Sequence, residues 1–588
     1  MQAIQQFAKE KNGKHTISLP KGTEVVSGSD ALILSLLEED VDTIFGYPGG
    51  AIMPIYDALY NYADHVKHIL VRHEQGAIHA AQGYARATGR PGIVFATSGP
   101  GATNLITGLA DAMIDSTPLV CITGQVLSHL LGTDAFQEID VMNITVPVTK
   151  WNTQVTRAED MADTVAKAFH IATTGRPGPV LIDVTKDAQF AKTIFRYKPC
   201  TQIKTYKPTP TLDHTSIEDA VLLINAAKKP YILAGQGVIL ADATKELIAF
   251  AEKSNIPVAS TLLGLSGFPQ DHPLYMGYLG MHGNYGPNKN TNECDLLIAV
   301  GMRFDDRVTG DVSRYAKQAK IIHLEIDKAE IHKIIHADVA IHANAKEALP
   351  LLTAAIQPAK HTAWLDSFRN FTKDEFEKII YNNCQNTTGE IKMAEVIFLL
   401  NEITNGEAVI VTDVGQHQMV TARYYQFKEP RTNITSGGLG TMGFALPAAM
   451  GAKLGVPDKP VIAIIGDGGF QMTLQELGTI SQFKIPVKII VLNNEFLGMV
   501  RQWQQMFFEG RYSFTEMNNP DFVKLNEAYG IKAKKVCERE ELRASIEEML
   551  LHDGPYFLEV KVEKEENVFP MIPTGAAVSD MLLEVKPS

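Results

Sequence analysis

Residues 461–494 read VIAIIGDGGFQMTLQELGTISQFKIPVKIIVLNN, and this stretch decides the fold. Val461–Ile465 and Val487–Leu492 are apolar runs of the kind that form strands buried on both faces of a sheet. Between them, Leu474–Phe483 has the apolar spacing of a helix. The stretch therefore predicts a strand–helix–strand unit, whose two strands are parallel.

Two oxygen-bearing side chains follow the strands of this unit. Asp467 lies in Gly466–Gly469, which we expect to form a tight turn after the first strand, and Asn494 follows the second strand. Because parallel strands end on the same edge of a sheet, both side chains should reach the crevice where such sheets bind ligands. One carboxylate and one amide suit Mg²⁺, and the backbone of Gly468 and Gly469 before a helix suits phosphate. An ordinary turn followed by an Asn cap is the simpler alternative.

The combination of GDG at 466–468 with NN at 493–494 resembles the signature of thiamine diphosphate enzymes. In that family the metal ligands would be Asp467, Asn494 and the backbone carbonyl of Phe496. Neither a G-x-x-x-x-G-K-[ST] loop nor a G-x-G-x-x-G turn occurs here, which argues against a nucleotide triphosphatase.

The bulk composition limits the remaining possibilities. A length of 588 residues predicts about three or four domains. The net charge of −13 argues against a nucleic-acid or anionic-membrane partner. The 5 cysteines form no C-x-x-C pair, so reduced thiols are expected. Residues 1–22 carry no signal-peptide core and are expected to be a mobile tail, and no stretch is long enough to span a bilayer, so a cytoplasmic protein is predicted.

Residues 23–190 alternate helical patterns with short apolar strands. Ser29-Asp30 should cap a helix over Ala31–Glu39. Glu74, in the sequence RHEQGA, follows a short strand and opens a helix rich in small residues. Taken alone, Glu74 is best explained as a first-turn carboxylate that the helix dipole favours.

A second α/β region covers 214–360, between expected linkers at 191–213 and 361–389. Its strands, predicted at Pro230–Ala234, Asp295–Val300 and Ile321–Ile326, end in glycine turns or an acidic residue. This pattern resembles dinucleotide binding, although a cofactor-free spacer domain remains open because a lone G-x-G is a weak signal.

A third region, 390–562, contains the central stretch and shares the rhythm of the first region, which suggests a distant duplication. Residues 563–588 are too apolar and proline-rich for a free tail and are expected to cap the molecule. The predicted fold class is α/β, with three doubly wound parallel-sheet domains.

Several motifs together resemble one family of thiamine diphosphate enzymes, the catalytic subunits of acetohydroxyacid synthase, also called acetolactate synthase. They are GYPGGAIMPIYD, RHEQGA, GTDAFQEID, GRPGPVLIDV, MHG, RFDDRVTG, GLGTMGFALPAA, GMVRQWQ and VFPMIPTGAA. The resemblance covers nearly the whole chain, and RFDDRVTG is its most discriminating part. It implies a pyrimidine-binding domain first, an FAD-binding domain second and a diphosphate- and Mg²⁺-binding domain third.

The resemblance also assigns roles around thiamine diphosphate. Glu74 would hold the pyrimidine N1′, so that the cofactor's own amino group can remove the proton from C2 of the thiazolium. Met442 would keep the cofactor bent, although core packing explains a methionine equally well. The other expected contacts are Gly440 with the amino group; Gln416, His417, Gly468 and Gly469 with the diphosphate; Gly50 and Gln137 with the reacting carbonyl; and Met499 and Trp503 in the substrate pocket.

The resemblance places FAD in the second domain, in a structural role without net redox change. The residues expected to contact it are Arg176, Gly235, Gly237, Met281, His282, Arg303, Asp305 and Glu325. Arg307 would reach the carboxylate of the incoming ketoacid. A surface ion pair with a neighbouring aspartate is the alternative for Arg307.

The implied reaction is the decarboxylation of pyruvate on thiamine diphosphate and transfer of the hydroxyethyl unit to a second 2-ketoacid. Pyruvate or 2-ketobutyrate as acceptor would give 2-acetolactate or 2-aceto-2-hydroxybutyrate, in branched-chain amino-acid biosynthesis. The active unit would be a homodimer or homotetramer, with or without a small regulatory subunit. Alternatives are glyoxylate carboligase, a flavin enzyme of the pyruvate oxidase type, and a catalytically inactive FAD-binding scaffold.

Overall fold

The computed structural model describes residues 8–11, 14–17, 25–385 and 388–584. The chain divides into two compact units, which are described separately: Met1–Ala85 with Arg90–Lys207, called unit 1, and Arg86–Gly89 with Pro208–Ser588, called unit 2. Across the described ranges, no helix combines the length and the apolar character needed to cross a membrane.

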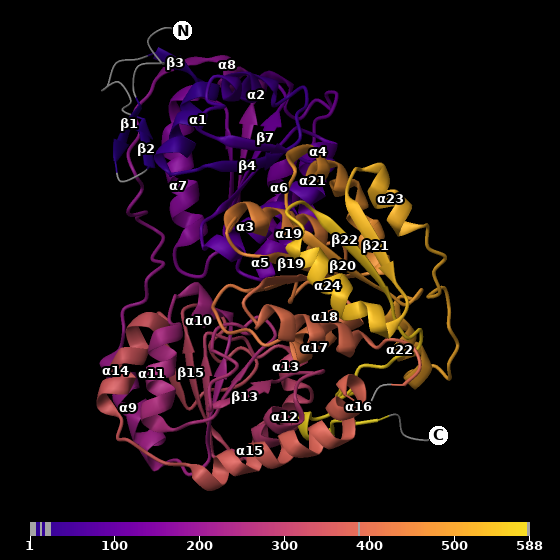
Figure 1. Ribbon diagram of the computed structural model, residues 1–588. Coiled ribbons are helices and arrows are strands. Elements are labelled where there is room, and N and C mark those ends of the chain that lie inside the picture. The colour runs from indigo at the N-terminus through magenta and orange to yellow at the C-terminus, as the bar shows by residue number, and fades with distance from the viewer. Residues whose placement is uncertain (1–7, 12–13, 18–24, 386–387, 585–588) are drawn as a thin grey trace. The chain divides into compact units, whose positions relative to one another are not determined.

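Unit 1 is built on a six-stranded sheet with the order β5-β4-β6-β7-β9-β8, in which every neighbouring pair is parallel (Figure 1). Its strands are β4 (Thr43–Gly46), β5 (Lys67–Leu70), β6 (Gly92–Ala96), β7 (Leu119–Gln125), β8 (Trp151–Val155) and β9 (Pro179–Thr185). Its helices are α1 (Gly28–Glu38), α2 (Met53–Tyr60), α3 (Glu74–Thr88), α4 (Pro100–Thr103), α5 (Ile106–Ile114), α6 (Val141–Thr145), α7 (Met161–Thr173) and α8 (Lys186–Phe190).

The start of α1 differs from the sequence expectation of a Ser29-Asp30 cap. The N-cap is Ser27, whose side chain accepts from the backbone N–H of Asp30, while the Asp30 carboxylate accepts from the N–H of Ser27. This reciprocal pair is a capping box, and it begins the helix at Gly28.

The flanks of unit 1 carry two short antiparallel pairs. Of the expected tail 1–22, the described residues are β1 (Ala8–Lys11) and β2 (Lys14–Ile17), which pair with each other; the rest of the tail lies outside the described residues. In the expected linker 191–213, β10 (Lys192–Ile194) pairs with β3 (Val25–Ser27).

The first sheet of unit 2 has the order β13-β12-β11-β14-β15-β16 and is also parallel throughout. Numbered within the domain this is 3-2-1-4-5-6, the order of dinucleotide-binding folds, whose crevice lies between strands 1 and 4. Its strands are β11 (Pro230–Ala234), β12 (Val258–Ser260), β13 (Tyr275–Tyr278), β14 (Leu296–Val300), β15 (Lys320–Glu325) and β16 (Val339–His342). Its helices are α9 (His214–Ala226), α10 (Gln236–Leu240), α11 (Thr244–Ser254), α12 (Tyr285–Thr291), α13 (Asp306–Thr309) and α14 (Ala345–Ala355).

The second sheet of unit 2 has the order β18-β17-β19-β20-β22-β21, again all parallel. Numbered within its domain this is 2-1-3-4-6-5, which is the order of the sheet in unit 1. Its strands are β17 (Val409–Thr412), β18 (Asn433–Thr435), β19 (Val461–Gly466), β20 (Lys488–Asn493), β21 (Lys532–Val536) and β22 (Tyr556–Lys561). Its helices are α17 (Met393–Thr404), α18 (Gln416–Tyr424), α19 (Ala445–Gly455), α20 (Asp467–Thr473), α21 (Leu477–Phe483), α22 (Gly498–Phe507), α23 (Phe522–Ala528) and α24 (Leu542–Leu551).

The GDGG sequence opens a helix and is not the tight turn expected from the sequence. β19 ends at Gly466, and α20 begins directly at Asp467. A carboxylate in the first turn of a helix is favoured by the helix dipole, and this accounts for the early start. The strand–helix–strand prediction is confirmed, because β19 and β20 are parallel neighbours.

The segment 361–389, expected to be a linker, is helical over most of its described length. It forms α15 (Thr362–Glu375), a π-helical turn (Phe376–Ile380) and α16 (Tyr381–Cys384). Trp364, Leu365 and Phe368 lie on one face of α15 and are buried in the core that surrounds β11–β16. The charged residues between them make this apolar face difficult to recognise from the sequence.

The C-terminal segment also packs against the β11–β16 domain. Ile572, Val578 and Met581 belong to the core of that domain, and Lys289 of α12 donates a hydrogen bond to the carbonyl of Ser579 at 2.9 Å. The fold class is α/β with three parallel-sheet domains, as predicted, and residues 572–581 are integrated into the second of them.

Candidate active site

The metal-ligand candidates lie where β19 and β20 end. Gly466 and Leu492 are paired across these strands, so Asp467 and Asn494 follow neighbouring strand ends, and both are buried. Asn519 donates a hydrogen bond from Nδ2 to Oδ2 of Asp467 at 2.7 Å. Burial raises the pKa of Asp467 to about 6, although the hydrogen bonds that its carboxylate accepts act to lower it. A cation beside the carboxylate would offset the cost of burying its negative charge.

Phe496 completes the predicted ligand set. Its backbone N–H donates to Oδ1 of Asn494 at 3.2 Å, and its ring is buried against Tyr512. The three expected ligands are all oxygen atoms, the donor type that Mg²⁺ prefers. Among the described residues no group of three His, Cys, Asp or Glu side chains is placed to hold a metal, so a softer transition-metal centre has no ligand cluster there.

His417, in the first turn of α18, has a buried polar atom that no group of the described chain hydrogen-bonds. Its ring is packed beside Gly415 and Gly466, where an added Cβ atom would lie 2.9 Å from ring atoms. Within the described chain, its buried Nε2 has no hydrogen-bond partner. Burial lowers the pKa of His417 to about 4, so the imidazole is neutral at neutral pH. A buried polar atom without a partner marks a position for a ligand, and a phosphate oxygen there would accept from Nε2 in the tautomer that carries the proton on this nitrogen.

Gln416, by contrast, already uses its side chain. Nε2 donates to Oε1 of Gln502 at 3.0 Å and to the backbone carbonyl of Glu566 at 2.8 Å, and Oε1 accepts from Asn494. Gly498 is needed beside it, since an added Cβ would lie 2.1 Å from Oε1 of Gln416. In this arrangement Gln416 offers a diphosphate its backbone N–H at the start of α18, and its side chain ties the site to the C-terminal segment.

Asp413, which was not among the predicted site residues, fixes the loop that precedes α19. It is fully buried, and its carboxylate accepts from the backbone N–H groups of Gly443 and Ala445, both at 3.0 Å. It also explains Gly469, where an added Cβ would lie 2.6 Å from Oδ1 of Asp413. Asp413 therefore holds the GTMG segment and the start of α20 together. The donors are about 30 positions away, so the sequence gives no local signal of this role.

The two residues expected to shape the cofactor lie on the GTMG segment. Gly440 is exposed with a φ of +70°, and the φ of Gly443 is +85°, so the segment depends on glycine conformations. Met442 is half-buried, and its terminal methyl group lies 3.8 Å from the Cβ position of Gly468. Met442 therefore projects towards the start of α20 and not into the hydrophobic core.

Met499 and Trp503, both expected in the substrate pocket, lie on α22. The segment is a helix with its polar residues turned inwards: Arg501 and Gln502 are fully buried. Trp503 is half-buried and stacks on Phe507 with ring centroids 4.8 Å apart. Arg501 and Gln502 face the C-terminal segment, which leaves Trp503 on the other side.

In unit 1, the predicted residues gather where β4 and β6 end. Glu74 is buried at the start of α3, and its Oε2 accepts from Nδ2 of Asn104 at 2.9 Å. Its Oε1 lies 3.3 Å from the Cβ position of Gly101, which in turn packs against Thr97. Thr97 also leaves no room for a side chain at Gly49. Gly50, by contrast, is exposed with open space around it.

Gln137 belongs to the same edge of unit 1. Its φ is +58°, and its backbone carbonyl lies 2.9 Å from the Cβ position of Gly99, in the turn that leads into α4. Arg176, by contrast, is used within unit 1, where it donates to the hydroxyl of Ser116 at 2.8 Å and to the carbonyl of Ile114 at 3.2 Å.

The glycines expected to meet FAD lie at the strand-order reversal of the β11–β16 sheet. Gly235 follows β11 and Gly301 follows β14, and the N–H of Gly237 donates to the carbonyl of Gly301 at 2.8 Å. A Cβ at Gly235 would lie 2.2 Å from that carbonyl, so both glycines of the G-x-G are required by this close approach. The turn also stands at the crevice of a dinucleotide-binding fold.

Met281 and His282 form the next expected FAD contact. Nδ1 of His282 is buried and finds no hydrogen-bond partner in the described structure, and burial lowers the pKa of this histidine to about 3. The backbone of Met281 is held on both sides, by the carbonyl of Arg307 and the N–H of Ile572.

Several side chains of the RFDDR segment, residues 303–307, make hydrogen bonds or ion pairs with neighbouring residues of the same segment. Asp305 caps α13 by accepting from the N–H groups of Arg307 and Val308. The Arg307 side chain is exposed and lies 3.7 Å from Asp306, as in the surface ion-pair alternative, and also contacts the sulfur of Met281. Arg303 lies 4.0 Å from Asp305. Glu325, at the end of β15, is buried and accepts from the backbone N–H groups of the two residues that follow.

Three family descriptions match successive parts of the chain. They are "Thiamine pyrophosphate enzyme, N-terminal TPP binding domain" at residues 26–144, the central domain of the same enzymes at 217–352, and their C-terminal TPP binding domain at 413–560.

Curated relatives match nearly the full chain. The acetolactate synthase large subunit of Corynebacterium glutamicum is 48% identical over 570 residues, which cover 95% of this chain and 90% of that protein. The acetolactate synthase isozyme 2 large subunit of Escherichia coli is 44% identical over 564 residues, or 95% and 99% of the two chains. The tobacco protein "Acetolactate synthase 2, chloroplastic" is 45% identical over 568 residues, or 95% and 85%. With the three domains in this order and relatives that align from end to end, the chain belongs to the acetolactate synthase large subunits of the thiamine pyrophosphate enzyme family.

Proposed function

We propose that the chain decarboxylates pyruvate with thiamine diphosphate and Mg²⁺ and transfers the hydroxyethyl unit to a second pyruvate or to 2-ketobutyrate. The observation that carries this proposal is the edge of the β17–β22 sheet. There the buried Asp467 and Asn494 lie beside His417, whose Nε2 is buried without a partner. The names of the relatives favour this reaction over the glyoxylate carboligase and pyruvate oxidase alternatives.

In this proposal, thiamine diphosphate supplies the electron sink that allows a 2-ketoacid to lose CO₂. The chain's own residues hold the cofactor. Asp467, Asn494 and the carbonyl of Phe496 bind Mg²⁺, and the first turn of α18 with His417 binds the diphosphate. This set fits because it offers hard oxygen ligands to the metal, and donors to the phosphate oxygens.

Glu74 is the proposed proton-holding group. Asn104 fixes one carboxylate oxygen at 2.9 Å, while the other lies near Gly101, where the absence of a side chain leaves room. A buried carboxyl that is anchored on one oxygen can present a proton at a fixed position, which is what general acid–base catalysis needs. Gly50 and Gln137, at the same edge of unit 1, are proposed to face the reacting carbonyl.

FAD is the third proposed cofactor, held by the β11–β16 domain. The strand order 3-2-1-4-5-6 and the buried Nδ1 of His282 support a flavin dinucleotide at this sheet edge. The proposed contacts remain Gly235, Gly237, Met281, His282, Arg303, Asp305, Glu325 and, from unit 1, Arg176. Arg307 is proposed to bind the carboxylate of the ketoacid, because its guanidinium is exposed and weakly engaged.

We further propose a cytoplasmic homodimer or homotetramer, and a regulatory small subunit is consistent with the "large subunit" in the names of the relatives. Light scattering on the purified chain gives the oligomeric state, and a monomer with full activity would exclude the dimer as the active unit.

The deciding experiment incubates the purified chain with pyruvate, thiamine diphosphate and Mg²⁺, with and without FAD, and identifies the product. We expect 2-acetolactate, and both acetohydroxyacids when 2-ketobutyrate is added. Asp467→Ala should lose Mg²⁺-dependent retention of thiamine diphosphate in equilibrium dialysis while retaining FAD. Asp458→Ala, which removes an exposed carboxylate of the same domain, serves as the matched control.

Other products would point to the alternatives. Oxygen uptake with pyruvate would support an oxidase, and tartronate semialdehyde from glyoxylate would support a carboligase. Normal retention of thiamine diphosphate by Asp467→Ala would show that the metal site lies elsewhere.

A further inference from the structure

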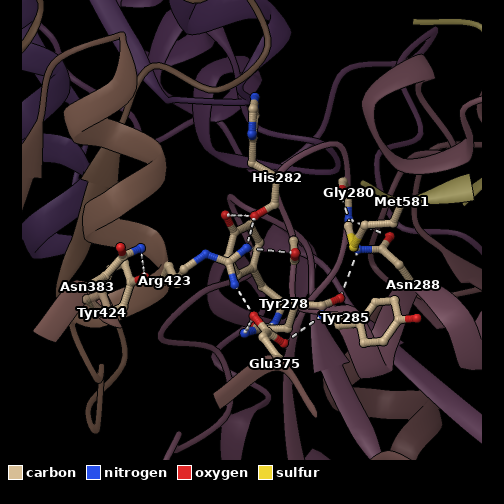
Figure 2. Close-up of polar contacts among 12 residues, drawn as sticks. Tyr278, Gly280, His282, Tyr285, Asn288, Glu375, Asn383, Arg423, Tyr424 and Met581 are labelled. Carbon is tan, nitrogen blue, oxygen red and sulfur yellow. Dashed lines mark hydrogen bonds and ion pairs between the residues drawn. The ribbon is translucent and has the colours of Figure 1, made fainter. Parts of the chain in front are cut away.

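An ion pair lies inside unit 2, away from solvent. Arg423 in the last turn of α18 contacts Glu375, the last residue of α15, and their side chains are 0% and 1% exposed (Figure 2). Burial opposes the charge of Arg423, but the charge of Glu375 keeps the pKa of the guanidinium above its usual range. The guanidinium of Arg423 is therefore charged within the protein interior.

The pair holds the backbone of one short loop, residues 282–285. Nη2 of Arg423 donates to the carbonyls of His282 at 2.6 Å and Gly283 at 2.8 Å. Glu375 accepts from the N–H of Tyr285 at 2.7 Å and from Nδ2 of Asn284 at 3.1 Å. Figure 2 shows Arg423 and Glu375 together, with His282 and Tyr285 beside them.

Each side of this network leads to a cofactor site proposed above. The loop begins at His282, whose Nδ1 is the candidate FAD contact. α18 begins at Gln416 and His417, the candidate diphosphate contacts, and Arg423 lies seven positions after Gln416, or about 10 Å along the helix. A single guanidinium thus bridges the helix of one site and the loop of the other.

Stability alone is a poor explanation for such a pair. Removing two charges from water costs much of what their attraction returns, and apolar residues of similar volume often replace buried ion pairs without loss of stability. The pair does fix one position of α18 relative to the 282–285 loop, because the hydrogen bonds of the guanidinium and of the carboxylate are directional. A cavity of about 330 Å³, lined in part by Arg423, Asn284 and Ala422, adjoins the pair.

We propose that the Arg423–Glu375 pair couples the two cofactor sites of unit 2, so that occupation of one site changes the affinity of the other. Ordering the 282–285 loop on FAD orders the last turn of α18 through Arg423, and diphosphate at the first turn of α18 acts in the reverse direction. Such reciprocity is required of any coupling between binding equilibria. The inference rests on the proposed binding of FAD and thiamine diphosphate.

The test measures the FAD dissociation constant of the full-length chain from flavin fluorescence, without and with saturating thiamine diphosphate and Mg²⁺. The ratio of the two constants is the coupling factor. The test variant is Arg423→Met/Glu375→Met, which removes both buried charges together. The matched control is Arg369→Met/Asp366→Met, which removes an exposed ion pair of α15 whose members are 55% and 54% exposed.

For the wild type and the control we expect a coupling factor in the usual range of about 5- to 150-fold. For Arg423→Met/Glu375→Met it should fall to about one. A purely structural role would weaken FAD binding equally with and without thiamine diphosphate, and the factor would stay unchanged; that result would overturn the inference. If the double variant does not fold, Glu375→Gln decides the question through the same ratio, since it removes one charge and keeps an acceptor for Tyr285.

Two further results separate this inference from the proposed function. A coupling factor of one in a wild-type chain that binds both cofactors would overturn the coupling and leave both sites assigned. Failure of the wild type to bind FAD at all would overturn the flavin site, and the coupling with it.

Discussion

Single side chains behind the expected ligands fix the geometry of the proposed metal site. Asn519 donates from Nδ2 both to Asp467 at 2.7 Å and to Oδ1 of Asn493 at 3.0 Å, and its own Oδ1 accepts from Gln471. It therefore holds the carboxylate of Asp467 in one orientation. Groups that orient a metal ligand contribute to affinity without touching the metal.

We predict that Asn519→Ala raises the Mg²⁺ concentration for half-maximal activity about 10- to 100-fold, because Asp467 loses its orienting donor. Titration of activity with Mg²⁺ at saturating thiamine diphosphate measures this effect. Asn518→Ala is the control, since Asn518 is the exposed neighbour. Equal Mg²⁺ requirements in the two variants would show that Asn519 has no part in the site.

We predict that Glu74→Gln keeps the fold and the cofactors but slows turnover about 10²- to 10⁴-fold, the usual contribution of a positioned acid–base group. Glutamine can keep the hydrogen bond from Asn104 but cannot exchange a proton. The measurement is the rate at which C2 of bound thiamine diphosphate exchanges hydrogen for deuterium, with the exposed Glu38→Gln as control. An exchange rate equal to that of the wild type would leave Glu74 as a first-turn carboxylate only.

At this scale the sequence indicates residues that belong to a contiguous motif and misses those that act across the chain. Asp467 and Asn494 are predictable because parallel strands bring their carboxyl ends together. Asn519 lies 52 positions from Asp467, and Glu375 lies 48 positions from Arg423. Nothing local distinguishes such residues from ordinary polar ones, because their partners are set by the packing of whole domains.

Among the elements, α22 combines a buried polar face with a half-buried aromatic one. Trp503 stacks on Phe507, which is 43% exposed, while Arg501 bonds to the carbonyl of Glu566 and to Asn567 in the C-terminal segment. The polar face therefore anchors the helix, and the aromatic face is available to a substrate.

We predict that Trp503→Leu still forms acetolactate but loses most of any preference for 2-ketobutyrate. One methylene in an apolar pocket is worth about 1–3 kcal/mol, and the flat indole is the group that would contact it. Competition between pyruvate and 2-ketobutyrate gives the product ratio. Phe507→Leu is the control for the stacked pair; if both variants, or neither, shift the ratio, Trp503 acts by packing alone.

The C-terminal segment gives a pH-dependent prediction. Burial raises the pKa of Glu566 from 4.5 to about 7, although its carboxylate accepts from the N–H of Met393 at 3.1 Å. Since the folded pKa is higher than the unfolded one, the folded state binds more protons between pH 4.5 and 7. The wild type should lose stability as the pH rises through this window.

We therefore predict that Glu566→Gln matches the wild type near pH 4.5 but is more stable at pH 8, by at most about 3 kcal/mol. The amide can still accept from Met393 and carries no charge. Thermal unfolding at several pH values measures the difference, and Glu565→Gln is the exposed control. Parallel pH profiles for wild type and Glu566→Gln would contradict the assignment.

The sequence predicts elements well where a buried strand lies between glycine or proline signals. Pro230–Ala234 forms a strand with the predicted bounds, because apolar runs of this length have few alternatives. The sequence predicts a linker where α15 forms, because the apolar face of this helix carries only a few large residues among charged ones. It misplaces the start of α1, because Ser27 and Ser29 are both good caps and only the contact with Asp30 decides between them.

Across the whole molecule, the three parallel-sheet domains have two different strand orders. The sheet of unit 1 and the β17–β22 sheet share the order 2-1-3-4-6-5, which supports the duplication inferred from the sequence, whereas the β11–β16 sheet has the order 3-2-1-4-5-6. Composition and periodicity predict three α/β domains, but strand order depends on which crossovers the chain takes, and no local pattern encodes it. The two orders match the proposed division into thiamine diphosphate and FAD sites.

We predict that Ile572→Ala destabilises the β11–β16 domain by about 2–5 kcal/mol, the cost of an isoleucine-to-alanine change in a core. Ile572 is 3% exposed and belongs to the core of that domain. Amide hydrogen exchange in β14 and β15 should become faster, whereas Leu551→Ala, at an 83% exposed side chain, should leave it unchanged. Faster exchange confined to residues 563–584 would show that the segment is only attached to the surface.

The packing of the C-terminal segment against the β11–β16 domain has a consequence for folding during translation. Ile217 of α9 and Met581 belong to the same core, so 581 − 217 = 364 positions separate the first and last pieces of one domain. At about 5–20 residues per second, translation needs roughly 20 to 70 seconds to bridge them. During that interval the nascent β11–β16 domain carries an unfinished apolar face, while the sheet of unit 1, whose strands end at Thr185, is already synthesised. A message truncated near its 3′ end therefore yields a product whose defect lies in the centre of the polypeptide, in the β11–β16 domain.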